Sequence, residues 1–134
     1  MRTFRHIIVL LLVLASATAA GAGEGDLAGC YSLDQGGDPW LRIEETDGTY
    51  TVTLKDRDGW NEGSSLHPGT QKELSGIFEN DSSRIKSSLI ADEGLFALFH
   101  VQAGEVYGGY KAKTDYITYI LIGAGSAYKN DCID

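Results

Sequence analysis

The sequence predicts an all-β domain, folded as a single small antiparallel β-barrel or as a strongly curved β-sheet of seven or eight strands. The chain contains 17 glycines but only two prolines, and short hydrophobic runs are separated by turn-forming pairs such as Asp-Gly and Asn-Asp. These runs recur roughly every 10 to 12 residues, which is the spacing of an antiparallel meander. No segment predicts a helix, and a two-layer β-sandwich is the alternative architecture.

The clearest predicted unit is a hairpin formed by residues 40–45 and 49–55. In both segments apolar residues alternate with polar ones, which is typical of a strand with one face toward the core and one toward water. Thr46-Asp47-Gly48 lies between them and contains the Asp-Gly pair that favours a tight turn. The long polar stretch that follows, residues 56–72, predicts a loop.

Further strands are predicted along the rest of the chain. They span residues 73–78, 84–90, 95–101, 106–112 and 116–122, with a last short strand at 126–129. Segments 95–101 and 116–122 are apolar on both faces, so we expect them in the centre of the sheet or with one face in a barrel interior. Gly108-Gly109 predicts a bulge or tight bend that curves the sheet.

Residues 1–22 have the three zones of a secretory signal peptide, which leaves residues 23–134 as a single β domain. Arg2 and Arg5 precede a continuous apolar run, and small residues follow it. The apolar run is far shorter than the roughly 20 residues that span a bilayer. We therefore expect an exported protein, periplasmic or secreted, without a membrane span.

A competing interpretation concerns Leu27-Ala28-Gly29-Cys30, which resembles a bacterial lipobox. In such a motif the cysteine is lipidated and becomes the mature N-terminus. A lipobox normally follows the apolar run directly, whereas here residues 15–29 intervene and include Glu24 and Asp26. A lipoprotein anchored through Cys30 is therefore the weaker alternative.

Cys30 and Cys132 are the only two cysteines, and in an oxidising compartment they predict one disulfide that joins the two ends of the domain. Their separation excludes a Cys-x-x-Cys redox motif and a multi-cysteine zinc site. By chain entropy, closing a loop of about 100 residues stabilises a fold by up to about 4.7 kcal/mol. The bond also requires the first strand and segment 126–129 to be neighbours.

The charge of the predicted mature chain is strongly negative. Without Arg2 and Arg5, nine basic side chains remain against 19 acidic ones, so the formal net charge is −10, compared with −8 for the whole chain. Such a surface repels phosphate backbones and anionic lipids. Nucleic acid and membrane surfaces are therefore disfavoured, and another exported protein with a basic cleft is favoured as the partner.

The most suggestive segment for binding lies in the predicted loop 56–72. A tryptophan among acidic and small residues provides a rigid aromatic anchor of the kind that dominates binding hot spots. The predicted partner-binding residues are Asp56, Asp58, Trp60, Asn61, Glu62 and His67. Four of them, Asp56, Asp58, Asn61 and Glu62, also offer oxygen ligands for calcium, but they lack the 12-residue register of an EF-hand. Calcium is thus a weak candidate, and no cofactor is predicted.

No catalytic residues are predicted. His67 lies close in sequence to Ser64 and Ser65, but no Gly-x-Ser-x-Gly elbow supports a nucleophile there. His100 falls in an apolar run and is expected to be structural. Both cysteines are assigned to the disulfide.

Two functions follow from these observations. The first is an exported, non-catalytic binding protein, an acidic inhibitor or immunity-type protein that binds a secreted or periplasmic hydrolase or toxin. The alternative is a lipocalin-like carrier of a small apolar ligand. The residues expected to line its barrel are Phe96, Leu98, Tyr107, Tyr119 and Leu121.

Overall fold

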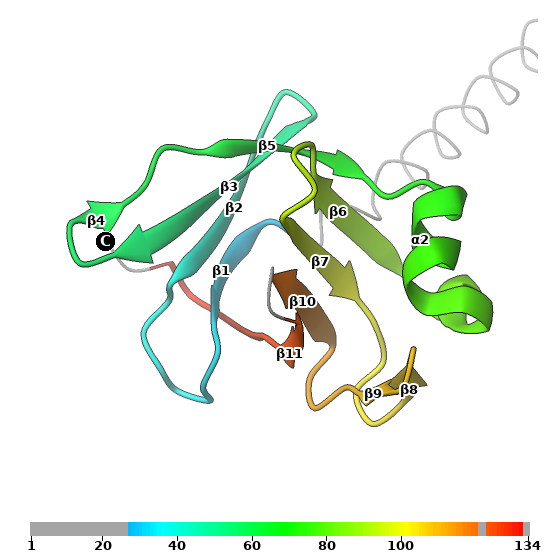
Figure 1. The fold of residues 1–134 in the computed structure, drawn as a ribbon. Coiled ribbons are helices and arrows are strands. Elements are labelled where there is room, and N and C mark those ends of the chain that lie inside the picture. The colour runs from blue at the N-terminus through cyan, green and yellow to red at the C-terminus, as the bar shows by residue number, and fades with distance from the viewer. Residues whose placement is uncertain (1–26, 121–122, 133–134) are drawn as a thin grey trace, which may run out of the picture.

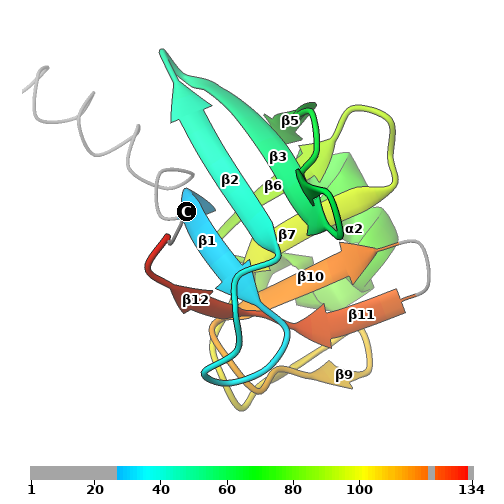
Figure 2. The same cartoon turned by 90° about the vertical axis from the view of Figure 1, so that its left-hand side faces the viewer.

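The computed structural model describes residues 27–120 and 123–132, which form a nearly closed, barrel-shaped antiparallel sheet with one short helix against its outside (Figures 1 and 2). The predicted signal peptide, residues 1–22, lies outside the described residues. The prediction of an all-β barrel or curved sheet is confirmed.

The strands are short, and two helical elements interrupt them. The strands are β1 (Gly29–Ser32), β2 (Leu41–Thr46), β3 (Thr49–Asp56), β4 (Gly59–Trp60), β5 (Ser64–Pro68), β6 (Ser87–Ala91), β7 (Phe96–His100), β8 (Val106–Tyr107), β9 (Tyr110–Lys111), β10 (Tyr116–Ile120), β11 (Gly123–Ser126) and β12 (Tyr128–Asn130). The helical elements are α2 (Gln71–Phe78) and the 3₁₀ helix η2 (Glu79–Arg84).

Nine strands follow one another in the order β11-β10-β7-β6-β5-β3-β2-β1-β12, and all of the neighbours in this order are antiparallel. β4 pairs with the end of β3, and β8 and β9 form a separate hairpin. The chain therefore returns to its starting strand after one circuit around the barrel.

The last segment of the chain joins the two ends of the sheet. β11 pairs with β10, β12 pairs with β1, and only Ala127 separates β11 from β12. At this junction the Ala127 amide donates to the Tyr116 carbonyl oxygen at 3.0 Å. Figure 2 shows β12 beside β1 and β11 beside β10. The predicted neighbourhood of the first and last strands is confirmed.

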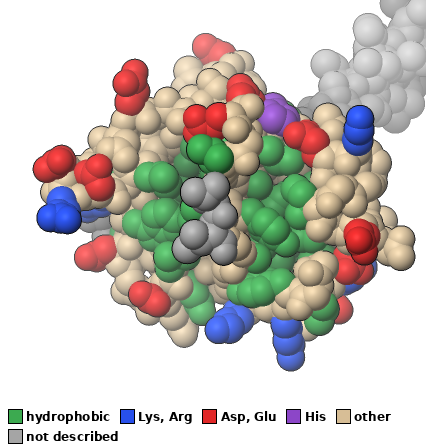
Figure 3. Space-filling view, in the orientation of Figure 1, with side chains coloured by type: hydrophobic (Ala, Val, Ile, Leu, Met, Phe, Trp, Pro, Cys, Tyr) green, Lys and Arg blue, Asp and Glu red, His purple; other side chains and the backbone are tan. Residues whose placement is uncertain are grey.

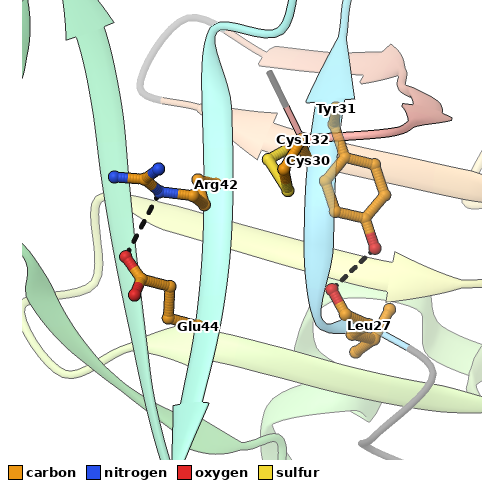
Figure 4. Close-up of a disulfide and its surroundings, with 6 residues drawn as sticks. All are labelled: Leu27, Cys30, Tyr31, Arg42, Glu44 and Cys132. Atoms are coloured by element: carbon orange, nitrogen blue, oxygen red, sulfur yellow. Dashed lines mark hydrogen bonds and ion pairs between the residues drawn. A yellow bond between two sulfur atoms is a disulfide. The ribbon is translucent and has the colours of Figure 1, made fainter. Parts of the chain in front are cut away.

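The predicted disulfide between Cys30 and Cys132 is present, with 5.1 Å between the two Cα atoms (Figure 4). Cys30 is fully buried in β1, and the neighbouring Tyr31 hydroxyl donates to the carbonyl oxygen of Leu27 at 2.7 Å. Leu27 is itself fully buried in the core. Cleavage before a lipidated Cys30 would remove Leu27 from this core, whereas the disulfide is compatible with a secreted or periplasmic protein.

The predicted hairpin is also confirmed, as β2 and β3. The strands pair from Leu41 opposite Leu54 to Thr46 opposite Thr49, so two residues connect them. These residues, Asp47 and Gly48, have φ angles of 52° and 82°. Positive φ at both central positions defines a type I′ turn, whose twist matches that of the flanking strands.

The barrel interior is filled by apolar side chains of the chain itself. The buried members of this cluster are Leu27, Tyr31, Leu41, Ile43, Val52, Leu66, Leu89, Ala91, Phe96, Leu98 and Ala127. Within the strands they come from β1, β2, β3, β5, β6 and β7, each of which turns one apolar face to the interior.

A second apolar cluster lies outside the barrel, where α2 covers β6, β7 and β10 (Figure 1). Its centre is Phe78, whose ring meets those of Phe99, Tyr107 and Tyr119 edge to face at centroid distances of 4.7, 6.3 and 5.6 Å. β7 contributes to both clusters, which explains why its sequence is apolar on both faces.

The predicted strand at residues 73–78 is wrong, because this segment is helix α2. Thr70 caps the helix: its hydroxyl accepts from the Glu73 amide at 3.1 Å, and the Glu73 carboxylate accepts from the Thr70 amide at 3.0 Å. This reciprocal capping box satisfies two amides that the first helical turn leaves unpaired.

Three further boundaries differ from the prediction. Residues 84–90 begin in η2, and the strand starts only at Ser87. Residues 106–112 are a hairpin in a sheet of their own, in which Gly108 and Gly109, with φ of 56° and 87°, are the turn rather than a bulge. The predicted loop 56–72 contains β4 and β5 and the start of α2.

Within the described part of the chain, no helix has the length and apolar character needed to cross a membrane.

The disulfide generates the first prediction. The double variant Cys30→Ser, Cys132→Ser is expected to lose about 2–5 kcal/mol of the free energy of unfolding, because the unfolded chain regains the entropy of an open loop. Denaturant unfolding measures this loss, and oxidised wild-type protein treated with reductant is the control that should match the variant. An unchanged midpoint with an unchanged slope contradicts the prediction.

The capping box generates the second prediction. Thr70→Ala removes the hydroxyl that accepts from the Glu73 amide and is expected to cost about 1 kcal/mol. Thr70→Ser keeps a capping hydroxyl and serves as the matched control, with a much smaller loss. Equal losses in the two variants, measured by thermal or denaturant unfolding, would show that the cap is not what stabilises α2.

Candidate functional site

A groove of about 310 Å³ opens at the end of the barrel where β10 ends and β7 begins. Its apolar walls are Val52, Leu54, Leu95, Phe96 and Ile120. Its polar rim is formed by Asn61, Glu62, Ser64 and Glu93. We call this feature the apolar groove.

Leu95 is the most exposed apolar residue of this groove, with 52% of its surface accessible. It lies in the turn between β6 and β7, and together with Phe96 and Ile120 it also lines a second hollow of about 300 Å³. That second hollow extends toward Ile77 of α2 and Tyr119 of β10. Apolar surface thus reaches from the barrel end to the helix.

Two carboxylates stand at the edge of this apolar surface. Figure 3 shows hydrophobic side chains over a large part of this face, with both acidic and basic side chains at its periphery. Glu62 and Glu93 stand directly on the rim of the groove: Glu62 precedes β5, and Glu93 follows β6, the strand that pairs with β5. A partner that covers this face meets an apolar centre and a negatively charged rim.

Two of the predicted binding residues, Asn61 and Glu62, belong to the groove. They follow β4 directly, and the Asn61 amide donates to the Leu54 carbonyl oxygen at 2.8 Å. This hydrogen bond ties the segment between β4 and β5 to β3 and sets its position at the groove rim.

Trp60 lies on the outer face of the sheet and not in the groove. The Arg42 guanidinium lies over the Trp60 ring, with its Cζ 4.5 Å from the ring centroid, and the Lys55 Nζ lies 5.9 Å from the same centroid. In β2 and β3, Arg42 and Lys55 alternate with residues that face the barrel interior. A cation–π contact of this kind is worth roughly 0.5–1 kcal/mol at an exposed site.

Asp56 and Asp58 form the exposed tip of the turn between β3 and β4. The Asp58 amide donates to the Asp56 carboxylate at 2.8 Å, which is an Asx turn. Within residues 27–120 and 123–132 no group of three or more His, Cys, Asp or Glu side chains is placed to hold a metal ion. The four weak calcium candidates are therefore divided between this turn and the groove rim.

His67 belongs to a different cluster, which the sequence did not predict. Its Nδ1 lies 2.6 Å from the Asp92 carboxylate, and its Nε2 lies 3.0 Å from the Glu73 carboxylate. Asp92 begins the turn between β6 and β7, and Glu73 lies in the first turn of α2. His67 thus bridges three elements: β5, α2 and the β6–β7 turn.

The two carboxylates raise the pKa of His67 above its ordinary value of about 6.5, chiefly through the hydrogen bond to Asp92 and then through that to Glu73. The pKa of Glu73 is lowered, first by the hydrogen bond from the Thr70 amide and then by that from His67. Both shifts favour the charged forms of the two side chains.

This arrangement supports an ionic bridge and not a catalytic base. A general base needs a ring nitrogen with a free lone pair directed at the group that it deprotonates. In this geometry each nitrogen of His67 faces a carboxylate oxygen, so neither is directed at a serine.

Eight residues of these sites were missed from the sequence: the two partners of His67, Glu73 and Asp92, and the groove residues Val52, Leu54, Ser64, Glu93, Leu95 and Ile120. A signal existed only for Glu73, since Thr-x-x-Glu at 70–73 is a capping-box pattern. The sequence predicts Leu95 as the first residue of the strand 95–101, whereas it lies in the turn before β7, and only the barrel places that turn beside β3 and β10.

The residues expected to hold an apolar ligand do not share one cavity. Phe96 and Leu98 face the barrel interior, whereas Tyr107 and Tyr119 pack outside it around Phe78. Leu121 lies outside the described residues. His100 stacks on Tyr116 at a centroid distance of 5.1 Å, which is a packing role.

Comparison of the chain with protein-family models, with curated proteins and with solved structures gives no match in any of the three. The function is therefore argued from the chemistry of the site.

The exposure of Leu95 generates the third prediction. Leu95→Asp is expected to reduce the free energy of unfolding by no more than about 1 kcal/mol, because half of this side chain is already in water. Leu98→Ala, at a fully buried position, is expected to cost about 2–5 kcal/mol. Similar losses in the two variants would show that Leu95 is a core residue.

Proposed function

We propose that the protein is an exported, non-catalytic binding module, an acidic inhibitor or immunity-type protein that engages a hydrolase or toxin outside the cytoplasm. The observation that carries this proposal is the apolar groove with its half-exposed Leu95 and the carboxylates of Glu62 and Glu93 on its rim. An apolar centre inside a polar rim is the usual anatomy of a protein-binding surface.

The charge supports a basic partner. The formal charge of −10 for residues 23–134 accelerates encounter with a positively charged cleft, and the apolar groove then slows dissociation by burying a side chain of the partner. The same negative surface disfavours binding to nucleic acid. Because the groove is built at the ends of paired strands, it is largely formed before the partner arrives.

The structure suggests a division of roles among the residues nominated from the sequence. The Trp60 ring is already stacked on Arg42, so its use as an anchor requires that this contact be given up. We therefore place the apolar anchor at Leu95 and assign Glu62, with the exposed Asp56 and Asp58, to electrostatic attraction. Trp60 is then a support for the outer face of β2 and β3.

A carrier of a small apolar ligand is the second candidate. The observation that favours it is the volume of the groove, about 310 Å³, which is at the lower end of ordinary small-molecule pockets. The barrel interior itself is occupied by its own side chains. A ligand of this protein would therefore sit in the groove, and native mass spectrometry of the purified protein would reveal it as an added mass.

The binding proposal generates the fourth prediction. Immobilised wild-type protein is expected to capture one exported protein stoichiometrically and to inhibit its hydrolytic or toxic activity. Leu95→Asp should weaken the complex at least about tenfold, since it places a charge in the apolar centre. Glu62→Lys with Glu93→Lys should reduce mainly the association rate, and the reduction should diminish in high salt.

Matched variants make this test specific. Glu45→Lys with Asp38→Lys changes the net charge equally but alters exposed residues that do not line the groove, and it should weaken binding much less. Trp60→Ala should have less effect than Leu95→Asp. Capture that survives Leu95→Asp but is lost in Trp60→Ala would move the site to the outer face, and a captured protein whose activity is unchanged contradicts the inhibitor function.

A further inference from the structure

His67 connects two structural elements that line the apolar surface. Asp92, which contacts its Nδ1, is followed by Glu93 and Leu95 in the turn at the groove rim. Glu73, which contacts its Nε2, lies on α2 one turn before Ile77, a wall of the second hollow. The imidazole therefore lies between the turn that carries Leu95 and the helix that borders the same surface.

Both contacts need a protonated ring. A neutral imidazole has one N–H and one lone pair, so it donates to only one carboxylate and directs its lone pair at the other. With Nδ1 and Nε2 both facing carboxylate oxygens, at 2.6 and 3.0 Å, only the imidazolium donates to Asp92 and Glu73 together. Loss of one proton replaces one of the two attractions by a repulsion between a lone pair and a carboxylate.

We propose that protonation of His67 regulates the apolar surface: the imidazolium holds the β6–β7 turn against the first turn of α2, and deprotonation releases one of these contacts and loosens the groove rim. The effect on binding rests on the proposed function, whereas the ionic bridge itself does not depend on any partner.

The charges around His67 are few. β5 and β6 carry no other titratable side chain except His67 itself, and β3 presents Tyr50, Thr51 and Val52 opposite β5. The charges that act on the imidazole come from Asp92 in the turn and Glu73 in α2. Backbone hydrogen bonds from Asp92 to Ser65 and from Gly94 to Ala91 keep the base of the turn in place, so deprotonation loosens the rim and does not unfold it.

The direction of the pH dependence follows from the two shifts. Because the folded-state pKa of His67 is raised, its contribution to the free energy of unfolding is complete below about pH 6.5. This contribution is lost as the pH rises through the raised pKa. Because the pKa of Glu73 is lowered, its contribution is complete above about pH 4.5 and is lost as the pH falls through the lowered pKa. The bridge is therefore strongest between these limits.

The first experiment tests the bridge without a partner. The His67 ring is titrated by NMR in the wild type, in Asp92→Asn and in Glu73→Gln, which keeps a side chain able to complete the capping box. The midpoint is expected above 6.5 in the wild type and lower in both variants, with the larger fall in Asp92→Asn. His100, in a different environment, is the internal reference. A midpoint at or below 6.5, or one that Asp92→Asn leaves unchanged, overturns the proposal.

The second experiment tests the effect on the groove rim. Amide hydrogen exchange in α2 and in the β6–β7 turn, corrected for intrinsic rates, should accelerate roughly two- to fivefold in the wild type as the pH passes the midpoint of His67. His67→Gln should exchange at the faster level throughout, and Thr70→Ser serves as a control for the helix cap. Identical pH profiles in the wild type and His67→Gln overturn the proposal.

The third experiment separates this inference from the proposed function. The probe is the blocked tripeptide Lys-Leu-Lys, whose charges do not change between pH 5.5 and 8.5, and binding is followed through the Leu54 and Leu95 methyl signals. Its affinity should fall roughly two- to fivefold above the midpoint of His67 and stay constant in His67→Gln. Binding that is independent of pH overturns the switch alone, whereas the absence of binding at any pH contradicts the function proposed for the groove.

Discussion

The rest of the structure depends on the closure of the barrel by the last ten described residues of the chain. β11 and β12 pair with strands that stand at opposite ends of the sheet order, β10 and β1, and the Cys30–Cys132 disulfide fixes the second of these pairings. Pairing between residues about 100 positions apart costs considerable loop entropy, and the disulfide removes part of that cost from the folding equilibrium. Without this closure β10 is held from one side only, and Ile120 loses its place in the groove wall.

The closed sheet also explains why the groove lies where it does. The interior cluster and the outer cluster under α2 share the sheet β6-β7-β10 as a common wall, and they approach each other at the end where Phe96 and Ile120 lie. At that end neither the barrel nor the helix extends far enough to cover the β6–β7 turn. The half-exposed Leu95 is thus a consequence of the architecture, and it is the position at which a second molecule gains most by burying apolar surface.

Local signals account for what could be predicted from the sequence. In the β2–β3 hairpin, apolar and polar residues alternate on either side of an Asp-Gly turn, and β7 is apolar on both faces. For these strands the spacing of the apolar residues and the composition were sufficient to predict the secondary structure. Helix α2 was missed because eight residues give little periodicity, although Thr70 and Glu73 form a recognisable capping box. Gly108-Gly109 is compatible with a bulge or with a turn, and only the pairing of Tyr107 with Tyr110 decides between them.

Asn61 and Glu62 were found because they share one polar segment, whereas Leu95, Asp92 and Glu73 become neighbours of that segment or of His67 only through the tertiary fold.

The charge of the protein and its specificity depend on different features of its surface. Exposed carboxylates such as Asp56 and Asp58 act at long range, are screened by salt and select only for a basic partner. Selection among basic partners requires a feature with shape, and the groove around Leu95 combines shape, exposure and apolar character. His67 touches the turn that carries Leu95 and also the helix beside it, so this histidine stands where a change in its charge affects shape rather than net charge. A change of one unit in a net charge near −10 would alter attraction only slightly, so the effect of His67 on binding must act through the position of the β6–β7 turn.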